Sequence, residues 1–238
     1  MELVINFSGG KDSTAMLAWL CERYPDVPKH VVMADTGWEH EDAIEWSRGI
    51  VARFGLVLHV VRNPNKTLIS MARKRGKFPG MSQRQCTSDL KRGPVHTWIR
   101  RRWPQRKSAP HPPVIVSCMG LRAEESSSRA GKPCLTKLNI LCGRRREVWD
   151  WNPILGWTEV QVRAYLAERG LPLHPVYGHL RRFSCRVCIY MTDHDLRAVA
   201  QHDPAAIAII ATVEREIGFT MFQRGAIEEL VVAPARKK

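Results

Sequence analysis

The residues with the clearest chemistry lie near the amino end, in the run Ser8-Gly9-Gly10-Lys11-Asp12-Ser13-Thr14. Two adjacent glycines let backbone amides approach an anion without an intervening Cβ. Where such a run opens a helix, the first backbone N–H groups and the helix dipole favour negative charge. Three hydroxyls add donors, and Lys11 can reach a phosphate oxygen. The run therefore predicts a phosphate-binding loop.

This loop differs from two other nucleotide-binding motifs. A P-loop needs Gly, four residues and then Gly-Lys-Ser or Gly-Lys-Thr, whereas here Lys11 is followed by Asp12 and the position five before Gly10 is Ile5. The sequence also contains no Gly-x-Gly-x-x-Gly, which the dinucleotide fingerprint requires. The alternative that remains is an ordinary glycine-rich turn between a strand and a helix.

Two arginines after the apolar run 114–119 offer a second set of anion donors. The planar guanidinium groups of Arg122 and Arg129 match phosphate or sulfate oxygens. Ligands of open α/β sheets bind at the carboxyl ends of the strands, so we expect Gly120 and both arginines at this edge. Asp35 ends an earlier apolar run at the same edge, where it could contact a ribose or hold Mg²⁺. The alternative is a solvated, charged loop.

Seven cysteines occur in a sequence whose first residues lack the features of a secretory signal. The odd count argues against a disulfide framework and favours metal or redox chemistry. Cys185 and Cys188 form a Cys-x-x-Cys pair that can turn toward one metal, and Cys86 is a distant third candidate. Three interpretations stay open. The three cysteines could bind a metal cluster, the pair could bind zinc with a histidine such as His179 or His194, or the pair is a buried or redox-active dithiol.

The basic surplus of the chain favours a polyanionic partner. Among 238 residues there are 37 Lys+Arg and 23 Asp+Glu, which gives a formal net charge of +14. Such a surplus suits nucleotides, nucleic acid, sulfate esters or an anionic membrane surface. Clustered arginines with tryptophans nearby could hold a nucleic acid backbone and stack its bases, although the tryptophans could instead be core residues. The clusters are at 73–75, 100–102, 144–146 and 181–182, and the tryptophans are Trp103, Trp149, Trp151 and Trp157.

Apolar runs and helical periodicities indicate which elements carry these residues. The order of strands and helices over the first sixty residues is β-α-β-α-β, which predicts an α/β fold with an open, mostly parallel sheet and flanking helices. Residues 120–146 are polar and turn-rich, so we expect a substrate loop there. The expected strands are 3–7, 30–34, 56–61 and 114–119, and the expected helices are 13–24, 41–54, 66–75, 87–103 (interrupted at Gly93-Pro94), 158–169 and 204–217.

We expect two regions that pack as one compact unit. Residues 1–150 would form the nucleotide-binding α/β domain, and residues 151–238 a helical region that carries the Cys-x-x-Cys. No run of 18 apolar residues exists, so we expect no membrane-spanning helix, no membrane partner and a cytoplasmic location.

In order along the chain, five segments resemble the phosphoadenosine-phosphosulfate (PAPS) reductase-like family of the PP-loop ATP pyrophosphatases. The first is similar to the PP-loop itself and the second to the end of the family's second strand. The others resemble its Cys-x-x-x-x-Lys-x-x-Pro, Gly-Ile/Leu-Arg-x-x-Glu-Ser-x-x-Arg and Pro-Ile-x-x-Trp-Thr motifs. The segments are 8–13, 34–39, 86–94, 120–129 and 152–158.

This resemblance implies a Rossmann-like PP-loop fold that binds ATP with Mg²⁺ and cleaves it between the α and β phosphates. The nucleotide-binding residues that it implies are Ser8, Gly9, Gly10, Lys11, Asp12, Ser13, Thr14, Gly120 and Arg122. The catalytic residues that it implies are Lys11, Asp12, Asp35, Arg122 and Arg129.

The resemblance also bears on the cysteines. Iron–sulfur members of the reductase branch have a Cys-Cys pair early and a Cys-x-x-Cys late, which implies a 4Fe–4S cluster on Cys86, Cys185 and Cys188. This chain departs from the pattern, because Gln85 precedes Cys86. One iron would then stay open for a sulfide, as in cluster-dependent tRNA thiolation enzymes, or a further cysteine would complete the site. The candidates for that fourth ligand are Cys118, Cys134 and Cys142.

A second departure concerns the reaction. Reductases of the family resemble one another in a Glu-Cys-Gly-Leu-His tail that supplies their nucleophile, and residues 218–238 contain no cysteine. We therefore expect ATP-dependent, pyrophosphate-releasing sulfur transfer to tRNA, DNA or a nucleotide, with a sulfur donor protein as a further partner. One alternative is a sulfonucleotide reductase that acts on PAPS or its non-phosphorylated analogue. Another is a non-catalytic nucleotide- or DNA-binding accessory protein.

Overall fold

The computed structural model describes residues 1–104 and 112–232, and the chain forms two compact units that are each discontinuous in sequence. The first comprises Met1–Ala34, Asp42–Val61 and Val95–His174, and the second comprises Asp35–Glu41, Arg62–Pro94 and the residues from Pro175 onward. These boundaries differ from the expected division at residue 150. The reason is that two short segments from the amino-terminal half share an apolar core with the carboxyl-terminal helices.

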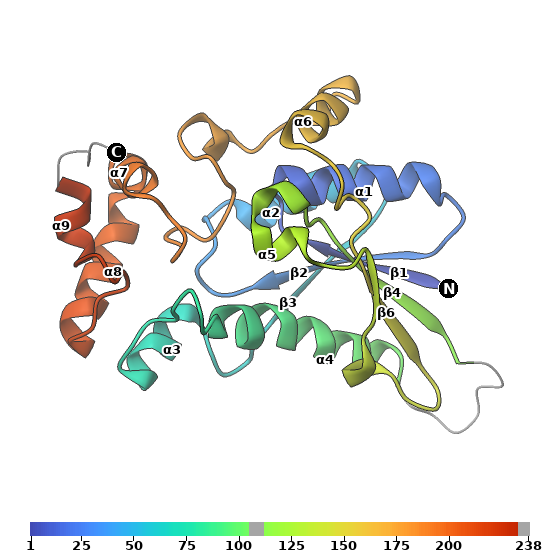
Figure 1. Ribbon diagram of the computed structural model, residues 1–238, viewed down its shortest axis with the longest axis horizontal. Helices are drawn as coiled ribbons and strands as arrows, with labels where there is room; N and C mark the ends of the chain where they lie inside the picture. Colours follow the sequence, from blue (N-terminus) through green and yellow to red (C-terminus); the bar gives the residue numbers. More distant parts are fainter. Residues whose placement is uncertain (105–111, 233–238) are drawn as a thin grey trace. The chain divides into compact units, whose positions relative to one another are not determined.

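Among the described residues, six strands form one sheet in the order β3-β2-β1-β4-β6-β5 (Figure 1). β1 pairs in parallel with β2 and β4, β4 pairs in parallel with β6, and only the short β5 is shown antiparallel, to β6. The expected open, mostly parallel α/β sheet is thus confirmed. The strands are β1 (Glu2–Phe7), β2 (Lys29–Asp35), β3 (Leu58–Arg62), β4 (Val114–Met119), β5 (Leu135–Lys137) and β6 (Glu147–Trp151).

Helices cover both faces of the sheet in the first unit. In Figure 1, α1 (Lys11–Arg23) and α6 (Glu159–Glu168) lie on one side and α4 (Gly93–Arg102) lies on the other. Beneath α4, Ile99 and Trp103 pack with strand residues in an apolar core. The sequence motif at the start of α6 is a capping box, because the Thr158 and Gln161 side chains each accept a hydrogen bond from the other's backbone N–H. The first unit also contains α2 (Ala43–Ala52).

Residues 120–151, which include the loop expected over 120–146, hold more regular structure than we expected. Besides β5 and β6, they form η2 (Ala123–Glu125), α5 (Ser127–Ala130) and η3 (Asn139–Leu141). The helix expected over 87–103 does change at Gly93-Pro94, where a π-helix, η1 (Cys86–Arg92), leads into α4. Because Pro94 falls in the first turn of α4, its missing N–H removes no hydrogen bond of that helix.

The second unit packs around an apolar core that includes Leu90, Val187, Leu196 and Ile210. Its best-predicted helix is α8 (Pro204–Ile217), which the Asp203 side chain caps and a glycine of positive φ ends. The other elements are α3 (Leu68–Arg75), η1, η4 (Pro175–Gly178), α7 (Asp193–His202) and α9 (Ile227–Val232). Across the described residues, every helix is too short or too polar to cross a membrane.

Candidate active site

The phosphate loop lies between β1 and α1, as its sequence predicted. Gly9 has a φ of 77°, which residues with a side chain rarely adopt, and Gly10 is the N-cap of α1 without any side-chain cap. The Ser13 and Thr14 hydroxyls both donate to the Gly10 carbonyl, at 2.9 and 3.0 Å. These two hydroxyls therefore fix the shape of the loop at the amino end of α1, where the helix dipole favours an anion.

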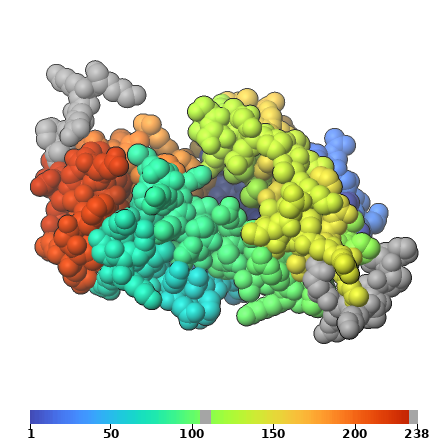
Figure 2. Space-filling view, turned by 60° about the horizontal axis from the view of Figure 1, so that its bottom comes forward, coloured from blue at the N-terminus to red at the C-terminus, as the bar shows by residue number. Residues whose placement is uncertain are grey.

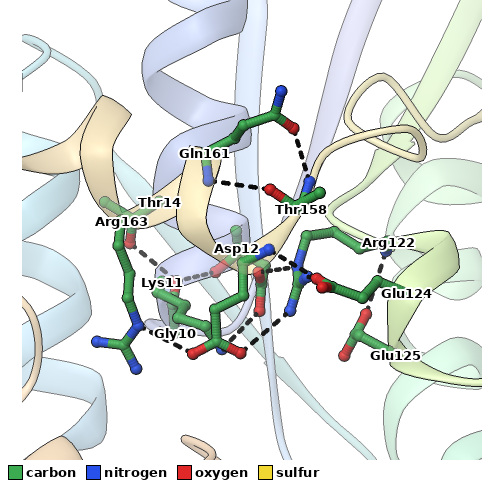
Figure 3. A network of polar contacts seen from close by, with 12 residues as sticks. Gly10, Lys11, Asp12, Thr14, Arg122, Glu124, Glu125, Thr158, Gln161 and Arg163 are labelled. Carbon is green, nitrogen blue, oxygen red and sulfur yellow. Dashed lines mark hydrogen bonds and ion pairs between the residues drawn. The ribbon is translucent and has the colours of Figure 1, made fainter.

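Lys11 and Arg122 meet three carboxylates beside this loop (Figure 3). The Arg122 Nε donates to Asp12 Oδ1 at 2.6 Å, and Nη1 of the same guanidinium pairs with Glu124. The Lys11 Nζ lies 3.4 Å from Asp12 Oδ2 and 3.8 Å from Glu159 Oε2, and that oxygen lies 3.6 Å from Arg122 Nη2. Lys11 is 5% and Arg122 3% exposed. The carboxylates therefore neutralise two buried cations.

The charged groups of this network shift one another's ionisation. Burial lowers the pKa of Arg122, but the neighbouring Asp12 and other carboxylates outweigh burial and raise it overall. Burial raises the pKa of Glu159, but hydrogen bonding to Arg163 and the charge of Lys11 outweigh that effect and lower it overall. Arg122 and Glu159 are thus both held in their charged forms at neutral pH.

Gly120, the residue directly after β4, packs closely against the backbone of the phosphate loop. A Cβ at this position would lie 3.0 Å from the backbone C and O of Asp12 and from the backbone N of Ser13. Only glycine fits there without a shift of the backbone. Gly120 therefore brings Arg122, two residues later, within reach of the loop.

This arrangement can bind a polyphosphate. An incoming phosphate would replace carboxylate oxygens on Lys11 and Arg122 and would accept from the first amides of α1. Figure 2 shows the yellow-green segment that follows Gly120 beside a hollow in which dark blue amino-terminal atoms are visible. The freed carboxylates are oxygen donors of the kind that Mg²⁺ prefers.

The other residues expected at the site have different surroundings. Arg129 pairs with Glu125, whose Oε2 also accepts from the backbone N–H of Arg122 at 3.1 Å, so Arg129 supports the turn that carries Arg122. Asp35 ends β2 and belongs to the second unit, where its Oδ1 accepts from the Gly37 N–H at 2.7 Å.

Two carboxylates of the network, Glu124 and Glu159, did not emerge from the sequence. Glu159 is the first residue of α6, and its backbone N–H donates to Glu124 Oε2 at 2.7 Å. A usable signal was present for each. Glu124 lies between the two arginines of one motif, and Glu159 follows the capping residue Thr158 at the start of a helix, where acidic residues are favoured.

In the second unit, one lysine interacts with all three candidate cysteines. Cys86 opens η1 and Lys91 is five residues later. In a π-helix the backbone hydrogen bonds join residues five apart, so both side chains share a face, which an α-helix would not allow. The Lys91 Nζ lies 3.8 Å from the Cys185 Sγ, and Lys91 also interacts electrostatically with Cys86 and Cys188.

The thiols and the lysine affect one another's pKa. Burial raises the pKa of Cys185 to about 12, and the charge of Lys91 opposes that rise. Burial likewise raises the pKa of Cys86, again against the charge of Lys91. The pKa of Lys91 itself is raised by Cys185 in its thiolate form. A lysine in this position can balance the charge of cysteine thiolates.

The three thiols are the donor set that a metal would use in the second unit. Over residues 1–104 and 112–232, no three His, Cys, Asp or Glu side chains are gathered in a metal-binding arrangement. Three thiols that share one lysine are nevertheless the soft donors that suit iron–sulfur clusters or zinc, so the residue types fit. The carboxylate oxygens of Asp12, Glu124 and Glu159, beside the phosphate loop, are likewise the donor type that Mg²⁺ prefers.

The cysteines considered as a fourth ligand all lie in the first unit. Cys118 is fully buried in β4, where its thiol donates to the Val116 carbonyl at 3.6 Å. Cys142 exchanges hydrogen bonds with the backbone of Val148, whereas Cys134 is exposed. Of the histidines considered for zinc, His179 stacks on His202 with ring centroids 4.0 Å apart, and His194 lies 3.9 Å from an Asp195 oxygen.

Comparison with known proteins shows the family to which this chain belongs. The sequence model of the phosphoadenosine phosphosulfate reductase domain matches residues 2–190. The chain belongs to the PAPS reductase domain family. This match confirms the resemblance found in the five sequence segments, and it spans both the phosphate loop and the Cys-x-x-Cys.

Relatives of this PAPS reductase domain protein include an uncharacterized 37.8 kDa protein of Escherichia phage 186, 24% identical, with 89% of this chain and 74% of the relative covered. The phosphoadenosine 5'-phosphosulfate reductase of Vibrio campbellii is 27% identical, with 74% of this chain and 61% of the relative covered. The chain thus spans about six tenths of the curated reductases that it matches.

A solved structure agrees with the fold. The PAPS reductase of Candida auris, crystallised as a phosphate complex, superimposes with a TM-score of 0.50 at 16% identity, over 75% of this chain and 77% of that one. At this identity the likeness shows a shared α/β architecture.

Proposed function

We propose that this PAPS reductase domain protein cleaves ATP to an adenylate and pyrophosphate in order to transfer sulfur to a nucleic acid or nucleotide. The observation that carries the proposal is the mixed network at the phosphate loop, in which Asp12, Glu124 and Glu159 alternate with the buried Lys11 and Arg122. Two cations suit a polyphosphate, and carboxylates beside them suit its magnesium ion.

The proposed reaction has two displacements. An oxygen of the acceptor attacks the α-phosphorus of ATP, the bond to the bridging oxygen breaks, and pyrophosphate leaves with both electrons of that bond. A sulfide sulfur from a donor then attacks the carbon that carries the activated oxygen, the bond between that carbon and the oxygen breaks, and AMP leaves with both electrons of the bond. Lys11 and Arg122 would neutralise the charge that develops on the departing pyrophosphate.

The metal partners of this proposal follow from donor chemistry. Asp12 with Glu124 or Glu159 would hold Mg²⁺, which neutralises phosphate charge. Cys86, Cys185 and Cys188 would hold a 4Fe–4S cluster, or zinc as the alternative, and a cluster with one open iron can carry a sulfide. Asp35 and Arg129 stay candidates for the ribose and for positioning Arg122.

Pyrophosphate release from ATP tests the proposal. The wild-type protein, supplied with ATP, Mg²⁺, mixed tRNA and sulfide, should release pyrophosphate, and Asp12→Asn should lower the rate by about 10-fold or more. Glu22→Gln is the matched control, because Glu22 lies on the same helix but pairs with Arg169 at the other end. If Asp12→Asn retains full function in cells, the protein is a non-catalytic binding protein instead.

Anaerobic purification tests the cysteine site separately. We expect visible absorbance and bound iron in the wild type, and loss of both in Cys185→Ser and in Cys86→Ser. Cys21→Ser is the matched control, because this cysteine of α1 lies in the other unit and is not a candidate ligand. Bound zinc without iron would select the alternative metal, and a metal-free, colourless protein with intact thiols would end both.

A second candidate, sulfonucleotide reduction, is favoured by the relatives, since curated PAPS reductases match 74% of this chain. That activity would release sulfite from PAPS or its non-phosphorylated analogue without consuming ATP. Assaying sulfite and pyrophosphate on the same preparation separates the two functions.

A further inference from the structure

An exposed aromatic ring lies next to the cysteine site and takes no part in the core. In the second unit, Trp38, Phe78 and Phe222 are each less than 5% exposed, whereas Tyr190 is 41% exposed. Tyr190 follows Cys188 by two residues. An exposed aromatic two residues from a half-buried cysteine is a place where a planar ligand can bind by stacking.

The orientation of this ring is fixed by two contacts. The Tyr190 hydroxyl donates to the Met81 carbonyl at 3.3 Å, and the Arg84 guanidinium lies 5.9 Å from the ring centroid. Arg84 precedes Cys86 by two residues, so the pair Tyr190–Arg84 joins the two chain segments that carry the cysteines. Its preorganisation lowers the entropy lost when a ligand stacks.

The chain segment that carries Arg84 is strongly basic, which favours an anionic ligand. Residues 62–94 contain nine Lys or Arg and a single Asp. Some of these cations are engaged, since Lys66 pairs with Asp89 and Arg73 pairs with Glu216 of α8. Exposed cations also flank the other segment, at Arg181 and Arg182. Aromatic rings within a basic surface are the recurrent design for binding single-stranded nucleic acid.

From these observations we infer that Tyr190 and Arg84 form a stacking platform for an unpaired nucleobase, which they hold beside Cys86, Cys185 and Cys188. The inference deepens the proposed function and rests on its nucleic acid acceptor. It names the acceptor class as a single-stranded or looped nucleotide, because a base within a duplex has no free face to stack on the ring.

Binding of a labelled oligonucleotide of mixed sequence, measured by fluorescence anisotropy without ATP, tests this platform. The single strand should bind more tightly than its duplex. Tyr190→Ala should weaken single-strand binding by about 5- to 100-fold, whereas Tyr190→Phe, which keeps the ring, should stay within about twofold. Phe219→Ala is the matched control, since it removes an aromatic that is 48% exposed in the same unit.

Three binding results would overturn the platform: equal affinity for single strand and duplex, unchanged affinity of Tyr190→Ala, or no oligonucleotide binding at all. If polyglutamate competed as strongly as the oligonucleotide, the ligand would be an acidic protein instead. Pyrophosphate release by the wild type separates this inference from the proposed function. Stacking without ATP cleavage would reject only the reaction, and ATP cleavage without stacking would reject only the platform.

Discussion

The Arg122 Nε donates a 2.6 Å hydrogen bond to Asp12 Oδ1, across 110 positions of the chain. This bond joins the turn after β4 to the first turn of α1, within the same unit. Because the same guanidinium also reaches Glu124 and Glu159, it contacts all three carboxylates of the network beside the phosphate loop. A planar group with five donors can do this, and a lysine ammonium cannot.

Arg122→Lys should therefore weaken the site even though it keeps the charge. Losing one or more charge-assisted hydrogen bonds corresponds to about 1.5–3 kcal/mol each, so pyrophosphate release at subsaturating ATP should fall by about 10- to 100-fold. Arg169→Lys is the control, because Arg169 makes a similar forked pair with Glu22, away from the loop. Equal rates for the two lysine variants would mean that the fork of Arg122 has no role.

Gly120→Ala should disturb the loop without changing any charge. The added Cβ would lie 3.0 Å from the Asp12 and Ser13 backbone, and overpacking of this kind destabilises by about 1–3 kcal/mol. Thermal unfolding should shift downward and ATP binding, measured by calorimetry, should weaken. The control is Gly156→Ala, where no atom lies within 4 Å of the new Cβ. Identical behaviour of both variants would contradict the close approach of Gly120.

The sequence predicted the central strands well because buried parallel strands read as continuous apolar runs. β1, β2 and β4 were found in this way, and the predicted ends of each strand lie within one residue of the observed ends. β6 was missed because basic residues precede it and it is partly exposed. β5 has three exposed residues, too few for any periodicity, so only its pairing with β6 defines it.

The site was predictable where one segment carries its own chemistry and not where distant segments meet. The glycines and Lys11 indicated the phosphate loop directly. The pairing of Arg122 with Asp12 and Glu159 is tertiary, so no local pattern shows it. The meeting of Cys86 with Lys91 depends on a π-helical turn, which sequence periodicity does not reveal because α-helical spacing would separate the two side chains.

The pH dependence of stability should reveal the ion pair of Asp203. Two 2.7 Å hydrogen bonds from Arg186 hold the pKa of Asp203 below its usual 3.8, and the N–H of Ala206 and the charge of His40 add to this. Because the pKa of Asp203 is lower in the folded protein than in the unfolded chain, ionised Asp203 stabilises the fold above pH 3.8. This stabilisation is lost as the pH falls through the pKa of the folded protein.

Asp203→Asn should therefore unfold at a lower temperature than the wild type at pH 7, and the two melting curves should converge as pH falls below about 3.8. Glu41→Gln is the control, because its carboxylate lies 3.6 Å from the same Arg186 but is 86% exposed, so little change is expected at any pH. A difference between wild type and Asp203→Asn that grows toward low pH would contradict this assignment.

The arginine clusters divide into exposed and structural members, which predicts opposite effects for two variants. Arg101 is exposed at the end of α4. Arg146 is 5% exposed and donates to the carbonyls of Leu141 and Trp103, both at 2.7 Å, and burial lowers its pKa. Arg146 was expected to face a polyanion, but its position shows that it holds the 139–146 turn against the end of α4.

Arg101→Gln should weaken oligonucleotide binding and reduce the slope of log Kd against log salt concentration by about one unit, with no change in melting temperature. Arg146→Gln should instead destabilise the first unit by about 1–3 kcal/mol, because buried carbonyls lose their donors, and should leave the salt slope unchanged. Both variants remove one positive charge, so net charge alone cannot separate them. If Arg146→Gln reduced the slope as Arg101→Gln does and melted like the wild type, Arg146 would be a surface contact after all.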